Sequence, residues 1–419
     1  MRLEADPDPA SENQSGADVP ADRAATTSRA CAADAHDAGA GSFAGRDYFP
    51  ELDGLRFFAF LLVYLFHQGI PGPLLASCVG TGAARVFRQN GWVGVQLFFI
   101  LSGFLITTLL LREETRRGEI SLRAFWIRRA ARIWPLYYLV VALGFVLIPA
   151  VEGFLTSPGQ RATLARHLPS FLAFVGNWSM IARGPVGSDI LSVLWSVCVE
   201  EQFYLVVPLL VACVGPRRRL LATTLLLIAS PAARAVLVAR GATQLQLQYN
   251  SLAQFDTLLG GVWLAIVWHA RPPGERAARL SRWGQWPLCA ASLWLISRWE
   301  LAHGPDWRRV VDFVAIWLCG LGLIAVAVAH DGVLRRVLAY QRFVWLGKVS
   351  YGLYMYHEVA FWLRDRLDPR LGWFPNKEIL LTIATFAATV GLAAASYYAF
   401  ERPFLKLKKR WTRVPSRPL

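Results

Sequence analysis

The sequence predicts an all-α polytopic membrane protein with about ten transmembrane helices. The 419-residue chain is 55% hydrophobic and 17% charged, whereas soluble domains are roughly 45–50% apolar and about 25% charged. Apolar stretches of about 20 residues, the length that crosses the hydrocarbon core of a bilayer, recur from residue 52 onward. Lys and Arg are distributed unevenly between the loops that join these stretches. This composition excludes a water-soluble globule and, beyond the N-terminal region, an intrinsically disordered chain.

The N-terminal region differs in composition from the rest of the chain. Residues 4–45 are rich in Ala, Asp, Gly and Ser and contain almost no large apolar residue, which predicts a disordered tail over 1–47. No apolar run follows the charged start, so a secretory signal peptide is not expected. The ten spans are expected at about 52–70, 91–111, 133–151, 193–214, 220–239, 251–269, 284–301, 310–329, 343–363 and 379–400. A shorter apolar piece at 168–182 is expected to be interfacial or re-entrant.

The charges of the loops predict the orientation. With a cytoplasmic N-terminus, the inner loops carry 24 Lys and Arg and the outer loops carry 12. By the positive-inside rule both termini are therefore cytoplasmic, with a basic tail over 405–419. The same bias accounts for most of the net charge of +15, so the expected partner is the lipid bilayer and not nucleic acid. The six cysteines have no paired spacing, which predicts neither a metal site nor a disulfide scaffold.

A few ionisable residues interrupt the apolar spans. His67 follows Arg56 by eleven residues, or ~16 Å of helix, and each alone has an ordinary explanation: a hydrogen-bonded histidine in the core and an arginine that extends to the interface. Arg129 and Arg132 share one helix face, and guanidinium groups bind phosphate bidentately. An ordinary positive inner loop is the alternative for this pair.

The polar residues of the spans separate into two layers. Glu200 and Glu201 point about 100° apart around their helix, so at least one of them must contact protein. The predicted outer layer contains His67, Glu200, Glu201, Asp256 and His357, and the cytoplasmic layer contains Arg56, Arg129, Arg132 and Glu401. Charge at these depths is costly and usually serves a reaction or a transport path.

Six motifs in order give the chain a family resemblance. They are Asp53-Gly54-Leu55-Arg56 with His67 eleven residues after the arginine; Phe98 to Ile106 (Phe-Phe-Ile-Leu-Ser-Gly-Phe-Leu-Ile); Arg129-x-x-Arg132; Leu194-Trp195-Ser196 through Glu200-Glu201-Gln202-Phe203-Tyr204; Leu346-Gly347 through Ser350-Tyr351 to His357; and Glu401-Arg402-Pro403-Phe404. With these motifs, residues 48–404 resemble the acyltransferase-3 family of integral-membrane acyltransferases.

The resemblance implies a ten-helix acyltransferase domain over 48–404 in the bacterial plasma (inner) membrane. It implies that the donor is acyl-CoA, usually acetyl-CoA, on the cytoplasmic side. The hydroxyl acceptor it implies is a glycan, peptidoglycan or a glycosylated natural product. His67 would be the catalytic histidine, and Arg56, Arg129 and Arg132 would be required. One departure is that Glu358-Val359 follows His357, where the family commonly has proline shortly after its histidine. Some members carry a further extracytoplasmic domain, which is not expected in the 18 residues after Glu401.

The spacing allows a mechanism of O-acyl transfer. We expect Arg129, Arg132 and Arg56 to hold the CoA phosphates, while His67 deprotonates the acceptor hydroxyl or carries the acyl group. Glu200 or Glu201 could orient the imidazole of His67, as carboxylates do in catalytic triads. Candidate hydroxyl donors near the reacting carbonyl are Ser102, Tyr204, Ser350 and Tyr351, and the alternative for each is a hydrogen bond that packs helices together. Trp195 is a candidate for the floor of a sugar cleft, with an interfacial aromatic residue as the alternative. The other supporting candidates are Asp53, Asp256, His357 and Glu401.

A proton-coupled transporter or flippase is the competing interpretation, because buried Glu, Asp and His also suit a carrier. Such carriers are often built from internal repeats, and the first five spans show no similarity to the last five. A carrier also gives no reason for an Arg-x-x-Arg pair beside a histidine-bearing span.

Overall fold

The computed structural model describes residues 48–67, 69–152, 158–270, 285–286, 288–292, 308–371 and 377–414. The predicted tail 1–47 and most of the predicted span 284–301 lie outside these residues. The described part consists of helices and contains no strand, which confirms the all-α class. Seven of its helical segments are long and apolar enough to cross a membrane: Val93–Arg117, Leu122–Val151, Asp189–Cys213, Pro216–Ala239, Ser251–His269, Val310–Ala329 and Lys377–Lys409. These confirm a multi-pass membrane protein, with seven such segments in the described residues where ten spans were expected.

The first predicted span, 52–70, corresponds to the shorter helix α2 (Pro50–Phe66), of 17 residues. Pro50 starts it, because the fixed φ of proline suits the first helical position and the missing N–H needs no partner there. The helix is buried among its neighbours, with Phe60 and Val63 fully inaccessible to solvent. It contacts α5 (Val93–Arg117), α17 (Val333–Leu338) and α18 (Gln341–Lys348).

The predicted span 343–363 is two helices and not one. Helix α18 ends at Lys348 and α19 (Ser350–Leu367) begins after Val349, whose φ of −95° and ψ of 8° leave the helical region. Gly347 lies directly on the backbone of α2, where a Cβ atom would overlap the carbonyl oxygen of Asp53. The chain therefore turns at this point because α18 packs on α2, a contact that an apolar run in the sequence does not reveal.

Glycines allow a close contact between α5 and α14 (Ser251–His269), the described pair of helices with the most extensive contact. A Cβ at Gly103 would overlap the carbonyl oxygen of Leu258, and one at Gly261 would overlap that of Ile100. Small residues allow membrane helices to pack backbone to backbone in this way. Helix α16 (Arg308–Ala329) packs against both of these helices, and α12 (Pro216–Ala239) packs against α14 and α16.

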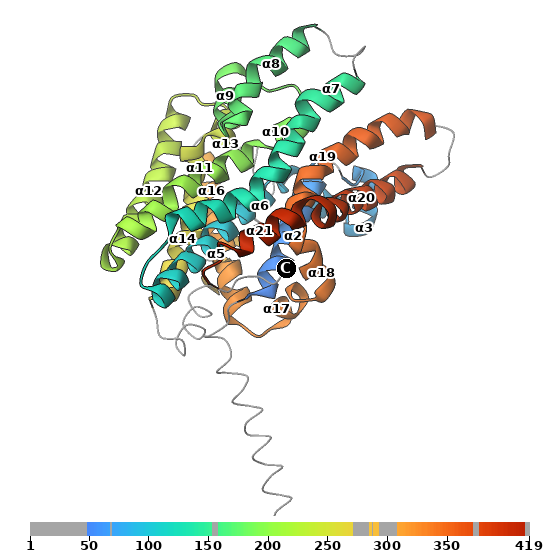
Figure 1. The fold of residues 1–419 in the computed structure, drawn as a ribbon. Coiled ribbons are helices and arrows are strands. Elements are labelled where there is room, and N and C mark those ends of the chain that lie inside the picture. Colours follow the sequence, from blue (N-terminus) through green and yellow to red (C-terminus); the bar gives the residue numbers. More distant parts are fainter. Residues whose placement is uncertain are drawn as a thin grey trace, which may run out of the picture. The chain divides into compact units, whose positions relative to one another are not determined.

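The remaining long helices are α6 (Leu122–Ala142), α11 (Trp195–Cys213), α19 and α20 (Lys377–Ala395). Helix α6 continues through η1 (Leu143–Leu147) and α7 (Ile148–Val151), and α11 contacts both α5 and α6. Helices α19 and α20 lie side by side, and Figure 1 shows α21 returning across α6. The chain reaches α21 (Arg402–Lys409) through the π-helix η3 (Ser396–Glu401). The tail predicted from residue 405 thus begins inside α21, where Leu405 is buried.

Short helices complete the described fold. The predicted interfacial piece 168–182 falls on α8 (Pro158–Leu172) and α9 (Gly176–Arg183), joined at Phe174 with a positive φ of 56°. The others are α3 (Gly72–Val79), α4 (Thr81–Asn90), α10 (Asp189–Ser192), α13 (Gln244–Tyr249) and η2 (Asp368–Leu371). Asn177 anchors α9, because its Nδ2 donates to the carbonyl of Tyr249 and to Oγ of Ser251, both at 2.9 Å.

Candidate active site

A cavity of about 90 Å³ lies where α2, α5, α6, α11 and α19 meet. Eight of the residues predicted from the sequence line it: Arg56, Ser102, Arg129, Arg132, Glu200, Tyr204, Ser350 and Tyr351. The other lining residues are mainly apolar and aromatic, and include Phe98, Phe99 and Tyr354. Residues from five helices, distant in the sequence, therefore converge on one interior space.

A second cavity, of about 80 Å³, lies beside the first. The two share Arg56, Leu105, Arg129 and Arg132 in their linings. Along α5 the linings extend from Val95 in the first cavity to Arg112 in the second, a span of ~25 Å at 1.5 Å per residue. The two cavities together thus follow most of the length of one membrane helix.

Two arginines, Arg129 and Arg132, line both cavities. Within the described residues, neither Arg129 nor Arg132 has a carboxylate within 4 Å, and Nε of Arg129 is buried without a hydrogen bond. Arg56 differs, because its Nη1 lies 3.4 Å from Oδ1 of Asp53. The other carboxylate oxygen of Asp53, Oδ2, accepts a 2.6 Å hydrogen bond from the hydroxyl of Tyr48. A partly buried guanidinium group without a counter-ion is costly, so Arg129 and Arg132 are suited to an anionic ligand.

The two adjacent glutamates face different surroundings. Glu200 lines the first cavity, where Oγ of Ser102 donates to it at 2.8 Å and the hydroxyl of Tyr204 at 3.0 Å. Glu201 points instead towards α6 and accepts a 2.9 Å hydrogen bond from Nε1 of Trp134. The ~100° between neighbours on a helix separates them, and Glu200 is the one that faces the site.

His67 meets a different carboxylate from the one expected. Its Nε2 lies 3.7 Å from Oε1 of Glu358 on α19, and Nε2 of His357 lies 3.3 Å from the same oxygen. The two imidazole rings are 5.1 Å apart. The expected pairing of Glu200 or Glu201 with His67 is not found, because both glutamates bond to other partners on α5, α6 and α11.

The tautomer of His67 follows from its backbone contact. Nδ1 lies 3.0 Å from the carbonyl oxygen of Val63, and a carbonyl can only accept, so Nδ1 carries the proton. The lone pair of the neutral ring is therefore on Nε2, facing Glu358. Nδ1 of His357 is held in the same way by the carbonyl of Tyr354, at 2.6 Å. The His67 side chain is 30% exposed and that of Glu358 only 7%, so of the two it is the histidine that a substrate can reach.

The ligand atoms of His67, His357 and Glu358 all lie within 4.8 Å of one another, which makes these three a group that could hold a metal ion. Two imidazoles and a carboxylate are a common ligand set for zinc and non-haem iron. Neither the metal spacing nor the carboxylate beside His67 was expected from the sequence, where Glu358 drew attention only as a departure from the family pattern.

Four other predicted residues lie elsewhere. Trp195 is 5% exposed, packs against Phe99 and Tyr249 with ring centroids 6.0 and 5.7 Å away, and is not among the residues that line either cavity. Glu401 accepts a 3.2 Å hydrogen bond from Oγ of Ser396 within η3. Asp53 lines the second cavity beside Arg56, and His357 is the buried neighbour of His67.

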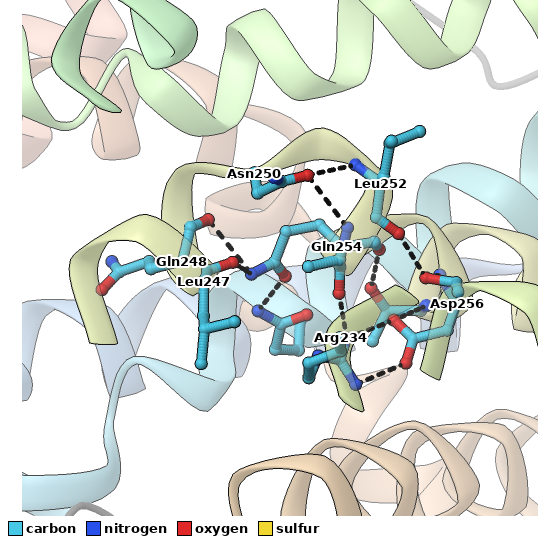
Figure 2. Close-up of polar contacts among 11 residues, drawn as sticks. Arg234, Leu247, Gln248, Asn250, Leu252, Gln254 and Asp256 are labelled. Atoms are coloured by element: carbon cyan, nitrogen blue, oxygen red, sulfur yellow. Dashed lines mark hydrogen bonds and ion pairs between the residues drawn. The ribbon is translucent and has the colours of Figure 1, made fainter. Parts of the chain in front are cut away.

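Asp256 lies in a buried ion pair that the sequence did not reveal. Both of its carboxylate oxygens accept from Arg234, each at 2.9 Å, and both side chains are fully buried. Figure 2 shows this pair, in which Arg234 also donates to the carbonyl of Ala253. The guanidinium carbon lies 4.0 Å from the ring centroid of Phe313. Asp256 therefore joins α14 to α12 and lines neither of the two cavities.

Comparison with known proteins agrees with this architecture. Residues 49–398 match the family model for the acyltransferase domain Acyl_transf_3. The chain belongs to the acyltransferase-3 family. Because the match runs from α2 to η3, it includes every helix that lines the first cavity.

The relatives are bacterial acetyltransferases. O-acetyltransferase OatA of Staphylococcus aureus is 28% identical over 326 residues, covering 74% of this chain and 50% of the relative. Peptidoglycan O-acetyltransferase OatA of Listeria monocytogenes is 27% identical over 380 residues, covering 86% and 56%. The putative peptidoglycan O-acetyltransferase YrhL of Bacillus subtilis is 28% identical over 374 residues, covering 85% and 55%. The chain thus spans about half the length of these curated relatives, and no solved structure matches it significantly.

Proposed function

We propose that this protein is a membrane O-acyltransferase that transfers an acyl group from acyl-CoA to a hydroxyl of a glycan. The first candidate for the acyl group is acetyl. The observation that carries the proposal is that Arg129 and Arg132, which line both cavities, have no carboxylate partner among the described residues. Membership of an acyltransferase family supports the reaction, and relatives named as peptidoglycan O-acetyltransferases make peptidoglycan the first candidate acceptor.

The donor binds from the cytoplasmic side in this proposal. The CoA phosphates lie against Arg56, Arg129 and Arg132, which have the bidentate geometry that phosphate favours. The pantetheine arm then extends through the first cavity past Ser102 and Glu200. The apolar and aromatic lining of that cavity suits a thin, largely uncharged chain.

The acceptor hydroxyl is activated by His67. Its oxygen attacks the thioester carbonyl, its proton passes to Nε2 of His67, and the CoA thiolate leaves and is protonated. The imidazolium that forms lies beside the carboxylate of Glu358, which stabilises it. Since Nδ1 is occupied by the carbonyl of Val63, Nε2 is the nitrogen that can take the proton.

The direct test uses purified protein in detergent with acetyl-CoA. An acyltransferase releases the free CoA thiol, increasingly so when a glycan acceptor is supplied, whereas the alternative, a transporter or flippase, leaves acetyl-CoA intact. Mass spectrometry of cell-wall glycan from cells with and without the protein then names the acceptor. A mass difference of one acyl group supports the proposal, and unchanged glycan excludes it as the acceptor.

Arg132→Ala is expected to raise the KM for acetyl-CoA by about 10–100-fold, because a hydrogen bond to a charged group contributes roughly 1.5–3 kcal/mol. Steady-state release of CoA at varied donor concentration measures it, and Arg129→Ala should act in the same direction. Arg218→Ala removes an exposed arginine in the first turn of α12 and serves as the matched control. If both variants keep the wild-type KM and turnover, the phosphate role is wrong.

Glu358→Gln is expected to lower kcat by roughly 10–100-fold and to leave the KM for acetyl-CoA near its wild-type value, because the carboxylate stabilises only the protonated His67. Glu358→Asp should recover part of the rate. The exposed Glu378→Gln is the matched control. An equal effect on KM and kcat, or no rescue by aspartate, would contradict this role.

A separate experiment tests whether His67, His357 and Glu358 hold a metal ion. Dialysis of the purified protein against a chelator is expected to leave transfer unchanged if Glu358 only stabilises a protonated histidine. Loss of activity that a divalent ion restores would assign His67, His357 and Glu358 to a metal instead.

A further inference from the structure

The second cavity has cationic side chains at two depths. Arg56, Arg129 and Arg132 also line the first cavity, and Arg112 and Lys408 line the second cavity only. Arg112 follows the shared residue Leu105 by seven positions on α5, or ~10 Å of helix. Among the described residues of this lining, Asp53 is the single carboxylate, and it is paired with Arg56. The described lining therefore contains five cationic side chains and one carboxylate.

Lys408 reaches this cavity because the end of the chain is tied to the α5–α6 region. Nη1 and Nη2 of Arg413 lie 3.3 Å from Glu113 and 2.8 Å from Glu119. Nη1 of Arg128 donates to the carbonyl of Trp411 at 2.8 Å, and the guanidinium group of Arg123 lies 5.5 Å from the Trp411 ring.

These contacts and the buried Leu405 hold α21 in one orientation. Lys408 is half-buried on the cavity side, whereas Lys406 and Lys409 of the same helix are exposed. Three lysines on one short helix thus have different surroundings, which makes the exposed ones suitable controls.

A CoA thioester also carries charge at two depths. Its diphosphate is attached to the end of the pantetheine arm opposite the thioester. A third phosphate, on the ribose, lies further from the thioester than the diphosphate does. We propose that Arg112 and Lys408 form the subsite for the ribose 3′-phosphate of the donor, while Arg56, Arg129 and Arg132 contact the diphosphate. This inference rests on the proposed use of acyl-CoA. It makes the C-terminal segment 402–414 part of the donor site, with Lys408 as a specificity-determining residue.

The test uses the full-length protein in lipid nanodiscs and two donors, acetyl-CoA and 3′-dephospho-acetyl-CoA, with KM measured for each. The wild type is expected to prefer acetyl-CoA by about tenfold or more, the size expected for a charge-assisted contact with phosphate. Lys408→Ala should lose most of that preference by weakening acetyl-CoA alone, and Arg112→Ala should do the same. Lys409→Ala should keep the wild-type preference.

The two proposals fail in different ways. Transfer from both donors with equal KM in the wild type, or a preference that Lys408→Ala and Arg112→Ala both retain, would overturn the 3′-phosphate subsite and leave acyl-CoA as the donor. A wild-type protein that uses neither donor would overturn the proposed function, and the subsite with it. A loss of preference in Lys409→Ala as large as in Lys408→Ala would show a general effect of charge and would also overturn the subsite.

Discussion

Replacement of His67 by alanine is expected to lower acyl transfer by about 10²–10⁴-fold, the usual contribution of a general base, while the protein still inserts and folds. The reason is local: Nε2 of His67 is the proton acceptor that faces Glu358, and the side chain is exposed enough to meet an acceptor. Release of CoA from acetyl-CoA in the presence of a glycan acceptor measures the rate, and chromatography in detergent measures the folded fraction.

His269 provides the matched control for this experiment. It also lies at the end of a helix with Nδ1 3.0 Å from the carbonyl oxygen four residues earlier, that of Ala265. Neither histidine is among the residues that line the two cavities, but His269 lies on α14, outside the group of His67, His357 and Glu358, so His269→Ala should keep the wild-type rate. If His67→Ala retains activity while folding normally, His67 has no part in the reaction and the proton must go elsewhere.

Asp256→Ala is expected to destabilise the protein by about 3–5 kcal/mol, because it leaves the charge of Arg234 fully buried without a partner. Thermal unfolding in detergent, followed by tryptophan fluorescence, should show a large decrease in Tm. The double variant Asp256→Ala/Arg234→Leu removes both charges and should recover much of the loss.

Asp331→Ala is the control for this second experiment. It removes the exposed partner of Arg335, at 3.3 Å, and should change stability by no more than about 1 kcal/mol. A variant Asp256→Ala with wild-type stability and no acyl transfer would contradict the structural role and place Asp256 in the reaction. The sequence alone marked Asp256 only as an intramembrane charge, because its partner Arg234 lies 22 residues earlier in a different helix.

Much of the candidate site was predictable because it follows from motifs on single helices. The first cavity is lined by Arg56, Arg129 and Arg132, which the sequence placed in the cytoplasmic layer, and by Glu200, which it placed in the outer layer. The structure thus brings together side chains that the two-layer pattern had separated. The contacts that the sequence did not predict depend on how each helix is rotated about its own axis. Trp195, five residues before Glu200, faces the core, and Glu358, next to His357, faces His67. Such rotations depend on close backbone contacts, as between Gly103 and Leu258, which have no periodic signal in one sequence.

The sequence by itself determined that this chain is a helical membrane protein of the acyltransferase-3 type, because hydrophobic length and motif order are local properties of a chain. Only the tertiary structure decided which side chains meet: Glu358 with His67, Arg234 with Asp256, and Lys408 with the cationic cavity. The physical reason is that burial requires an ionisable group to face a partner or a cavity but does not specify which one. That choice is made when the helices pack, since packing determines which charges in separate helices come within a few ångströms of each other.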